Sequence, residues 1–229
     1  MTGLLLVAKP SGPTSYDLIR WAKRIVPKGV KIGHCGTLDP MATGLMILLF
    51  GKATKVQDSL MHQPKVYRGT LRRGIQTDSG DITGVVTIEQ PIPAIDDATW
   101  ATVASAMVRE HTQTPPMYSA VKINGTPLYK LARKGETIER KSRIITITQF
   151  DWLDRAGDDV SFRVRCSSGT YVRTLAEDIG RRLGTVATLA ALEREVVGGY
   201  HVNAALPADA IRHLSMAELE QKMLPVPAI

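Results

Sequence analysis

The stretch Gly33-His34-Cys35-Gly36-Thr37-Leu38-Asp39-Pro40-Met41-Ala42-Thr43-Gly44 runs directly into the apolar segment Leu45 to Phe50. Its glycines, proline and threonines disfavour a helix and a regular strand, so the sequence predicts an ordered loop around Asp39. The unbroken apolar run that follows is typical of a strand buried on both faces. Asp39 before Pro40 also fits a helix N-cap, but a following strand would leave no helix to cap. Ordered loops often carry chemistry, which makes Asp39 the first candidate.

Composition limits the possible classes of protein. A chain of 229 residues that is 44% hydrophobic can bury one good core and a small additional lobe. Its net charge of +7 favours a polyanionic partner, with nucleic acid ahead of acidic lipid. No apolar run approaches the roughly 18 residues that cross a bilayer, and the short apolar start does not fit a signal peptide. A cytoplasmic protein without a membrane partner is therefore expected.

Two cysteines, Cys35 and Cys166, are present without metal-ligand spacing. Neither a zinc site nor a structural disulfide is expected from them. Asp78 and Asp81 could suggest a metal loop, but the glycines and threonines around them offer too few oxygen ligands. Their sequence context favours turns in which the carboxylate accepts backbone N–H groups.

Hydrophobic periodicity and turn signals predict a succession of strands and helices. Strands are expected at 3–8, 45–50, 66–74, 85–89 and 196–202, a hairpin at 144–153 and 160–166, and helices at 16–26, 96–109, 128–134, 171–183 and 186–192, followed by a thin helical tail. The stretch Ser167-Ser168-Gly169-Thr170 is interpreted as the start signal of the helix at 171–183. No repeat or long linker divides the chain.

The segment from Gln113 to Arg143 is polar and basic and contains two tyrosines. Its basic residues are Lys122, Lys130, Arg133, Lys134, Arg140, Lys141 and Arg143. A basic stretch interleaved with aromatic residues can form a flexible lobe that grips RNA. A solvated insertion without any partner is nearly as compatible with this composition.

Several motifs follow one another along the chain. They are Lys9-Pro10-x-Gly12-x-Thr14-Ser15, the Asp39 loop, Lys65-x-Tyr67 with Gly74, Thr77, Asp78, Asp81 and Gly84, Gln113-x-Pro115-Pro116-x-Tyr118-Ser119-Ala120-x-Lys122, and Cys166-Ser167-x-Gly169-Thr170-Tyr171-Val172-Arg173-Thr174-Leu175-Ala176-x-Asp178-Ile179-Gly180. Each motif is weak alone, and together they are highly specific. In this order they resemble the TruB family of RNA pseudouridine synthases, and the resemblance extends from about Leu4 to Tyr200.

The resemblance implies an α+β pseudouridine synthase fold, with a curved, mixed and mostly antiparallel sheet, flanking helices and the basic lobe at 113–143. It implies a catalytic domain at 1–203 and a short tail at 204–229 without the RNA-binding PUA domain that many relatives append. The implied activity is isomerisation of uridine 55 in the tRNA T-loop to pseudouridine, without cofactor or metal. The implied partner is the T-arm of tRNA, and a monomer is expected.

The resemblance also implies roles for individual residues. Asp39 would be the catalytic carboxylate, and Arg173 its ion-pair partner, which keeps it ionised in a desolvated pocket. Tyr67 would stack on the target base, which must be flipped out of the loop to reach the carboxylate. His34 would assist this flipping. The remaining RNA-binding or base-binding candidates are Lys9, Tyr171, Lys122, Arg133 and Leu192, of which Lys9 and Leu192 suit pocket or structural positions.

Some residues depart from the pattern of the family. Ala8, Cys35 and Thr188 replace residues usual in relatives, and Glu193 and Glu195 stand in a stretch that relatives make more basic, which would weaken phosphate contacts there. Three alternatives therefore remain: a noncatalytic protein that binds or folds tRNA with the same cleft, a hydrolase that would need a second positioned carboxylate, and a guide-RNA-dependent synthase.

Overall fold

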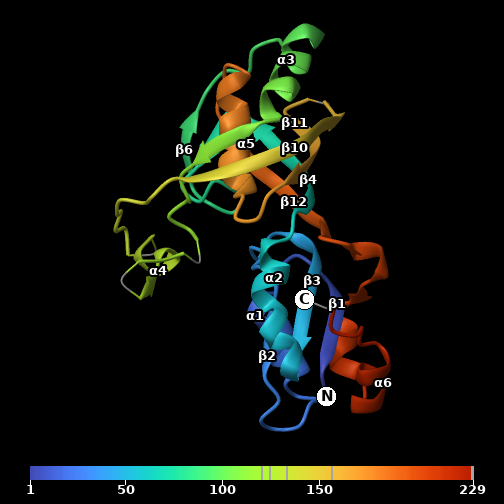
Figure 1. The fold of residues 1–229 in the computed structure, drawn as a ribbon. Helices are drawn as coiled ribbons and strands as arrows, with labels where there is room; N and C mark the ends of the chain where they lie inside the picture. The colour runs from blue at the N-terminus through green and yellow to red at the C-terminus, as the bar shows by residue number, and fades with distance from the viewer. Residues whose placement is uncertain (120, 124, 133, 156, 228–229) are drawn as a thin grey trace. The chain divides into compact units, whose positions relative to one another are not determined.

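The computed structural model describes residues 1–119, 121–123, 125–132, 134–155 and 157–227, with the side chains of 122 and 127 excepted. It comprises two compact units, one formed by Met1–Tyr67 together with Glu193–Ile229 and the other by Arg68–Leu192 (Figure 1). Strands β4 (Lys65–Arg73) and β12 (Ala187–Val197) each begin in one unit and end in the other.

The first unit is built on a mixed sheet with the strand order β14-β1-β3-β12. β1 (Gly3–Lys9) pairs antiparallel with β3 (Thr43–Phe50) from Gly3↔Phe50 to Lys9↔Gly44. β3 also pairs antiparallel with β2 (Ile32–His34) and parallel with the end of β12. β14 (Leu206–Pro207) and β13 (Tyr200–His201) add to β1 and β12. The loop between β2 and β3 carries Asp39.

Helices and an apolar core complete the first unit. They are α1 (Ser15–Ala22), η1 (Gly51–Val56), α2 (Gln57–His62), η2 (Val202–Ala204), η3 (Ala208–His213) and α6 (Met216–Gln221). One buried cluster joins the three N-terminal strands, η1, α2 and β12, and consists of Leu4, Leu6, Cys35, Leu45, Ile47, Leu49, Ala53, Val56, Leu60 and Val197. The C-terminal segment is tied to β1 because Leu4 and Leu224 exchange backbone hydrogen bonds of 2.9 and 2.8 Å.

The second unit contains the strand order β4-β11-β10-β7. β10 (Arg143–Asp154) pairs antiparallel with both β11 (Asp159–Cys166) and β7 (Glu110–Gln113). Two small antiparallel pairs are separate from these strands: β5 (Ile75–Thr77) with β6 (Val86–Glu89), and β8 (Lys122–Ile123) with β9 (Thr126–Pro127). The prediction of an α+β fold with a mixed, mostly antiparallel sheet is confirmed.

The helices of the second unit are α3 (Asp97–Met107), α4 (Leu128–Ala132) and α5 (Val172–Arg182). α3 packs against β10, as Figure 1 shows, and the Trp152 indole N–H donates to the carbonyl of Trp100 at 3.0 Å. Trp100 and Trp152 meet edge to face with ring centroids 4.8 Å apart, an arrangement that aromatic pairs favour. α5 begins at the residues that the sequence motif places around Arg173.

The predicted helix at 186–192 is wrong, because residues 187–192 form the first half of β12. Alanine and leucine favour a helix locally, but backbone partners in the second unit take up the hydrogen bonds of this segment. The N–H of Leu189 donates to the carbonyl of Gly80 at 3.1 Å, and its carbonyl accepts from Ile82 at 2.9 Å. Tertiary pairing therefore overrides helix propensity, which differs by less than about 1 kcal/mol between most residues.

Two helix ends also differ from expectation. α1 ends at Ala22, and the chain continues in tight turns in which Arg24 and Ile25 donate to carbonyls three residues earlier. At α5 the N-cap is Tyr171, which makes no capping bond through its own side chain. None of the helices in the described part of the chain has the length and apolar character needed to span a bilayer.

Candidate active site

Asp39 lies on a tight turn between two strands of the first unit. The backbone N–H of Ala42 donates to the carbonyl of Asp39 at 3.1 Å, and β3 begins immediately after this turn at Thr43. Asp39 is half-buried and caps no helix. The prediction of an ordered loop that leads into a buried strand is confirmed.

Lys9 fixes this turn from the end of β1. Its side chain is 2% exposed, and its ammonium group donates to the carbonyls of Pro10 at 3.0 Å, Pro40 at 3.0 Å and Ala42 at 2.6 Å. Two of these carbonyls belong to the Asp39 turn, so Lys9 holds the backbone on which the carboxylate stands. Lys9 therefore supports the backbone of the Asp39 turn through two of these hydrogen bonds.

Burial lowers the pKa of Lys9 to about 8, and the charge of Asp39 opposes this shift while that of Arg194 adds to it. Removing an ammonium group from water disfavours its charged form, and a nearby carboxylate favours it. The coupling shows that the Asp39 carboxylate and the Lys9 ammonium act on each other electrostatically. Lys9 therefore contributes a fixed positive charge beside the candidate catalytic group.

α1 supplies a second support for the loop. Thr14 caps this helix, and its side chain and that of Asp17 satisfy each other's backbone N–H groups in a capping box. This start places Ser15 so that its hydroxyl accepts from the N–H of Leu38 at 2.8 Å and contacts the carbonyl of Leu38 at 3.0 Å. The residue directly before Asp39 is thereby fixed on both sides of its backbone.

Arg194 on β12 is a third support, and the sequence analysis assigned it no role. The side chain is buried, and its Nε donates to the carbonyl of Leu45 at 2.8 Å while its Nη2 donates to the carbonyl of Gly36 at 3.1 Å. Had the segment 187–197 been interpreted as a strand, Arg194 would have fallen on the inward face with Leu192 and Val196. The predicted helix at 186–192 and strand at 196–202 left residue 194 between two elements, so this signal was missed.

His34 and Cys35 lie where β2 enters the loop. Burial lowers the pKa of His34, and the positive charge of Arg194 lowers it further, so the imidazole is neutral at pH 7. Its buried Nδ1 has no hydrogen-bond partner among the described residues. A neutral ring with an unpaired nitrogen is compatible with the predicted contact to a base, which stays a prediction.

Cys35 and Cys166 should resist thiol reagents in the folded protein. Both side chains are buried, and burial raises the pKa of the Cys35 thiol to about 11, so little reactive thiolate exists at pH 8. We expect slow reaction with a disulfide reagent such as dithionitrobenzoate in native buffer and rapid reaction of both thiols in guanidinium chloride. Prompt labelling of Cys35 in the native protein would show that the Asp39 loop opens readily.

Tyr67 and Leu192 are the last residues of the sequence ranges Met1–Tyr67 and Arg68–Leu192. Tyr67 lies in β4 at the end of the first unit and is 8% exposed. Leu192 lies in β12 at the end of the second unit and is also buried. Their positions fit apolar or stacking roles, and a contact of either residue with a base stays a prediction.

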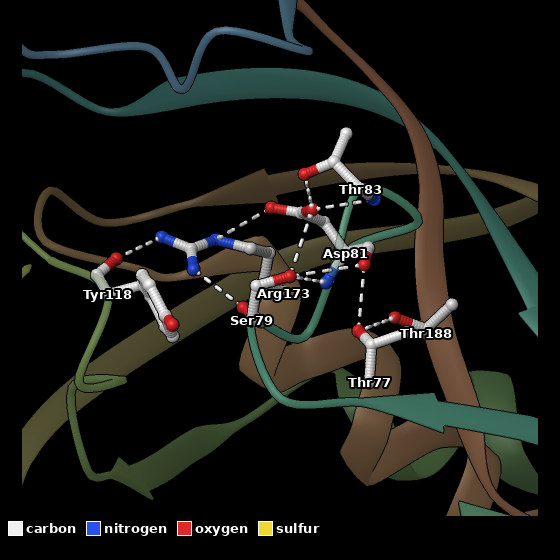
Figure 2. Close-up of polar contacts among 7 residues, drawn as sticks. All are labelled: Thr77, Ser79, Asp81, Thr83, Tyr118, Arg173 and Thr188. Carbon is white, nitrogen blue, oxygen red and sulfur yellow. Dashed lines mark hydrogen bonds and ion pairs between the residues drawn. The ribbon is translucent and has the colours of Figure 1, made fainter. Parts of the chain in front are cut away.

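Arg173 forms the centre of a buried polar cluster in the second unit (Figure 2). Its side chain is 4% exposed, Nη1 donates to the carbonyl of Ser79 at 2.7 Å, and Nη2 donates to the carbonyl of Tyr118 at 2.5 Å. Nε lies 4.0 Å from Oδ2 of Asp81. One guanidinium therefore joins the start of α5 to the loop at 77–84 and to the segment around Tyr118.

Asp81 is held in this cluster by its neighbours. Its Oδ1 accepts from the N–H and hydroxyl of Thr83 at 3.0 and 2.5 Å and from the Ser79 hydroxyl at 3.0 Å. The Thr77 hydroxyl donates to the carbonyl of Asp81 at 2.7 Å and contacts the Thr188 hydroxyl at 3.0 Å (Figure 2). The expected turn interactions of Asp81 are present, and its contact with Arg173 was not anticipated.

The predicted pairing of Arg173 with Asp39 stays a prediction, because the two residues belong to different units. Within the second unit Arg173 already has an acidic neighbour, Asp81. Two segments of the sequence contribute to the Arg173 cluster: the acidic turn at 77–84 and the Tyr171-Val172-Arg173 motif. No local pattern links them, since they lie far apart in the chain.

Tyr171 is the N-cap of α5, and its backbone is bound by the side chain of Gln113, the first residue of the Gln113-x-Pro115-Pro116 motif. The buried Gln113 accepts from the Tyr171 N–H through Oε1 at 2.7 Å and donates to its carbonyl through Nε2 at 3.1 Å. The guanidinium of Arg143 lies 5.0 Å from the centre of the Tyr171 ring. Lys122 lies in β8, and Arg133 lies outside the described residues.

No group of three or more His, Cys, Asp or Glu side chains suited to a metal occurs among the residues that the structure describes. The chemistry that these residues can supply is that of a half-buried carboxylate on a rigid turn, supported by buried cations, and a separate buried arginine–aspartate cluster. A carboxylate of this kind, in a protein of net positive charge, is chemically suited to act as a nucleophile or an electrostatic group toward a polyanion.

Comparison with known proteins identifies the family. The sequence model described as TruB family pseudouridylate synthase (N terminal domain) matches residues 23–172. The tRNA pseudouridine synthase B of Opitutus terrae is 45% identical over 226 residues, which cover 99% of this chain and 93% of that protein. The enzyme of the same name from Burkholderia mallei is 43% identical over 229 residues, which cover 100% of this chain and 75% of that protein. The chain belongs to the TruB family of pseudouridylate synthases.

The fold agrees with this assignment. A chain in the crystal structure of a Cbf5-Nop10-Gar1 complex superimposes with a TM-score of 0.72 at 25% sequence identity. The match covers 98% of this chain and 60% of the other, so this chain spans about three fifths of that chain's length. The predicted pseudouridine synthase fold is confirmed.

Proposed function

We propose that this protein is a tRNA pseudouridine synthase that isomerises uridine 55 of the T-loop, with Asp39 as its catalytic carboxylate. The observation that carries the proposal is the rigid Asp39 turn, which Lys9, Ser15 and Arg194 hold by side-chain hydrogen bonds to its backbone. The names of its relatives, which share 43 to 45% of its residues, support tRNA as the substrate.

The reaction needs one group that assists both bond breaking and bond making. The bond between N1 of uracil and C1′ of ribose breaks, the base turns, and a new bond joins C5 to C1′. The proton on C5 is lost to solvent and N1 gains one, so atoms and electrons balance without an oxidant or co-reactant. A carboxylate at Asp39 can stabilise or trap the separated fragment while the base turns. No cofactor is required by this scheme.

Other residues would serve the substrate. A base in a folded loop must leave its stack, which costs a few kcal/mol, and an aromatic face returns part of this cost. We assign this stacking role to Tyr67 and the assistance of flipping to His34. Arg173 would pair with Asp39 when the substrate is bound and would lower its pKa, as a guanidinium beside a carboxylate does.

A basic groove in the first unit supports RNA as the partner. The groove has a volume of about 400 Å³, and Lys31, Lys52 and Lys55 contribute to its lining together with Met1, Thr2, Gly29, Val30, Gly51 and Thr54. The three lysines are exposed, and no carboxylate is present among the described residues that line the groove. Exposed lysines around a concave surface attract phosphate groups.

Reversing charge in this groove should weaken tRNA binding in a salt-dependent manner. For Lys52→Glu/Lys55→Glu we expect a raised Kd for tRNA and a log–log salt slope that is smaller by about 2, because each lysine on a phosphate releases about one counterion. Filter binding over a series of salt concentrations measures both quantities. The matched control is Lys23→Glu/Arg24→Glu, which makes the same change in net charge outside the groove. Equal losses in both double variants would assign the effect to net charge alone.

Site-specific mapping of pseudouridine tests the function itself. The purified protein is incubated with an unmodified tRNA transcript, without metal or nucleotide, and pseudouridine is located by carbodiimide treatment and primer extension. We expect a stop confined to uridine 55. Tight, salt-sensitive binding without a stop at any position would favour the noncatalytic tRNA-binding protein, and free uracil among the products would favour a hydrolase.

A further inference from the structure

We propose that Arg194 is a positioning residue for the reaction: it fixes the place of the Asp39 carboxylate by joining both arms of the Asp39 loop to β12. This inference rests on the proposed function, because the quantity it explains is the rate at which the loop performs catalysis. Arg194 has no place among the candidate residues that the sequence pattern provides.

The hydrogen bonds of Arg194 reach the chain on both sides of Asp39. Nη2 donates to the carbonyl of Gly36, which precedes the turn, and Nε donates to the carbonyl of Leu45, which follows it. Nη2 also lies 3.0 Å from the sulfur of Met46. A planar guanidinium with several fixed donors can bridge two backbone strands in this manner, and an ammonium group cannot reproduce the fork.

The backbone of the loop is shaped around this side chain. Gly44 pairs with Arg194 in the parallel register of β3 and β12, and a Cβ at Gly44 would lie 2.4 Å from the Arg194 carbonyl oxygen. A Cβ at Gly36 would lie 3.3 Å from Nη1 of Arg194. Gly36 and Gly44 have positive φ angles of 86° and 104°, which would be strained for any other residue. Glycine at both positions therefore allows the loop and the arginine to approach closely.

Stability alone does not account for this arrangement. Arg194 is 1% exposed, and among the described residues its hydrogen-bond partners are two carbonyl oxygens and a sulfur, with no carboxylate in ion-pair distance. Removing a charge from water is costly, and well-packed apolar residues often replace buried ionic groups without loss of stability. The buried guanidinium therefore serves the geometry of the Asp39 loop.

The charged groups around Arg194 come from several elements of the first unit. The positive charge of Arg194 acts on Lys9 at the end of β1, on His34 at the end of β2 and on Cys35 directly after it. Lys9 also faces the carboxylates of Asp39 and Asp17, and Cys35 also faces Lys65. After burial, the positive charge of Arg194 is the next cause that lowers the pKa of His34. This coupling is consistent with a guanidinium that contacts the loop backbone.

Three variants separate positioning from general stability. Arg194→Met keeps the volume and removes charge and donors, and Arg194→Lys keeps the charge and removes the fork. Val196→Ala is a buried control on the same strand, at the position that pairs with His201 of β13. For each we measure the single-turnover rate of pseudouridine formation with saturating enzyme, the Kd for tRNA and the midpoint of unfolding.

We expect Arg194→Met to lower the single-turnover rate about 100-fold, since displacement of a catalytic group by about 1 Å costs roughly that factor. The Kd for tRNA should be unchanged, Arg194→Lys should recover part of the rate, and Val196→Ala should lower the unfolding midpoint and keep the rate. In Arg194→Lys, hydrogen exchange of the backbone amides in the peptide at 33–50 should accelerate. This measurement tests the inference even if Arg194→Met does not fold.

A wild-type rate in folded Arg194→Met would overturn the inference, as would a rate loss equal to that of Val196→Ala at matched stability. Unchanged exchange at 33–50 in Arg194→Lys would also contradict it. These outcomes are distinct from failure of the proposed function, in which the wild-type protein itself would form no pseudouridine.

Discussion

Replacing Asp39 by asparagine is expected to abolish pseudouridine formation while leaving the fold and tRNA binding intact. Asparagine has nearly the same shape, and the hydrogen bonds that hold the turn involve its backbone: the Asp39 carbonyl accepts from Ala42, and Lys9 binds the Pro40 and Ala42 carbonyls. The substitution therefore removes the negative charge and the nucleophilic oxygen and keeps these backbone hydrogen bonds.

The expected loss in the single-turnover rate is about 1,000-fold or more, because removing a catalytic nucleophile commonly costs several orders of magnitude. The Kd for tRNA should change little, since a half-buried carboxylate would repel phosphate and contributes no attraction to it. Asp209→Asn is a matched control, an equal change of charge at an exposed carboxylate in the same unit. Full activity of Asp39→Asn would assign catalysis to another group.

Gly44→Ala is expected to have the largest effect on stability. Gly44 has a φ angle of 104°, and an added Cβ would lie 2.4 to 2.9 Å from the carbonyl oxygen, nitrogen and carbonyl carbon of Arg194. Backbone atoms on a paired strand cannot move aside as a flexible side chain can. We expect the free energy of unfolding to fall by about 3 kcal/mol or more, through backbone strain and overlap together.

Gly29→Ala separates these two contributions. Gly29 has a similar φ angle of 93°, and nothing lies within 4 Å of an added Cβ. Its substitution should cost only the backbone strain, about 1 to 2 kcal/mol. Urea denaturation of both variants measures the difference. Equal destabilisation would mean that β12 shifts to accommodate the Gly44 side chain, and that the loop is less tightly held than the hydrogen bonds of Arg194 indicate.

The Asp39 loop shows how far local sequence can lead. Glycine, proline and threonine around a carboxylate, followed by an apolar run, predict a loop and a buried strand, and both are present. The supports of the loop were harder to predict, because Lys9, Ser15 and Arg194 come from β1, α1 and β12. Contacts between distant segments leave no periodic signal in one sequence.

In the segment 186–192, by contrast, local sequence predicts the wrong element. Its alanines and leucines favour a helix, and hydrogen bonds with distant backbone segments, including Gly80 and Ile82, decide for a strand. The predicted boundaries also concealed Arg194, because they left residue 194 between a helix and a strand. A charged residue is notable on the inward face of a strand and ordinary in a connecting segment. The Arg173 cluster likewise depends on the carbonyls of Ser79 and Tyr118, which any sequence could supply.

Release of tritium from tRNA labelled at C5 of uridine tests the central claim most directly, because only formation of the new carbon–carbon bond frees this hydrogen. Wild-type protein and Asp39→Asn are compared on an unmodified transcript and on one with cytidine at position 55. The account predicts release by the wild-type protein from the uridine-55 transcript alone, and none by Asp39→Asn. Undiminished release by Asp39→Asn, or equal release from the cytidine-55 transcript, would contradict it.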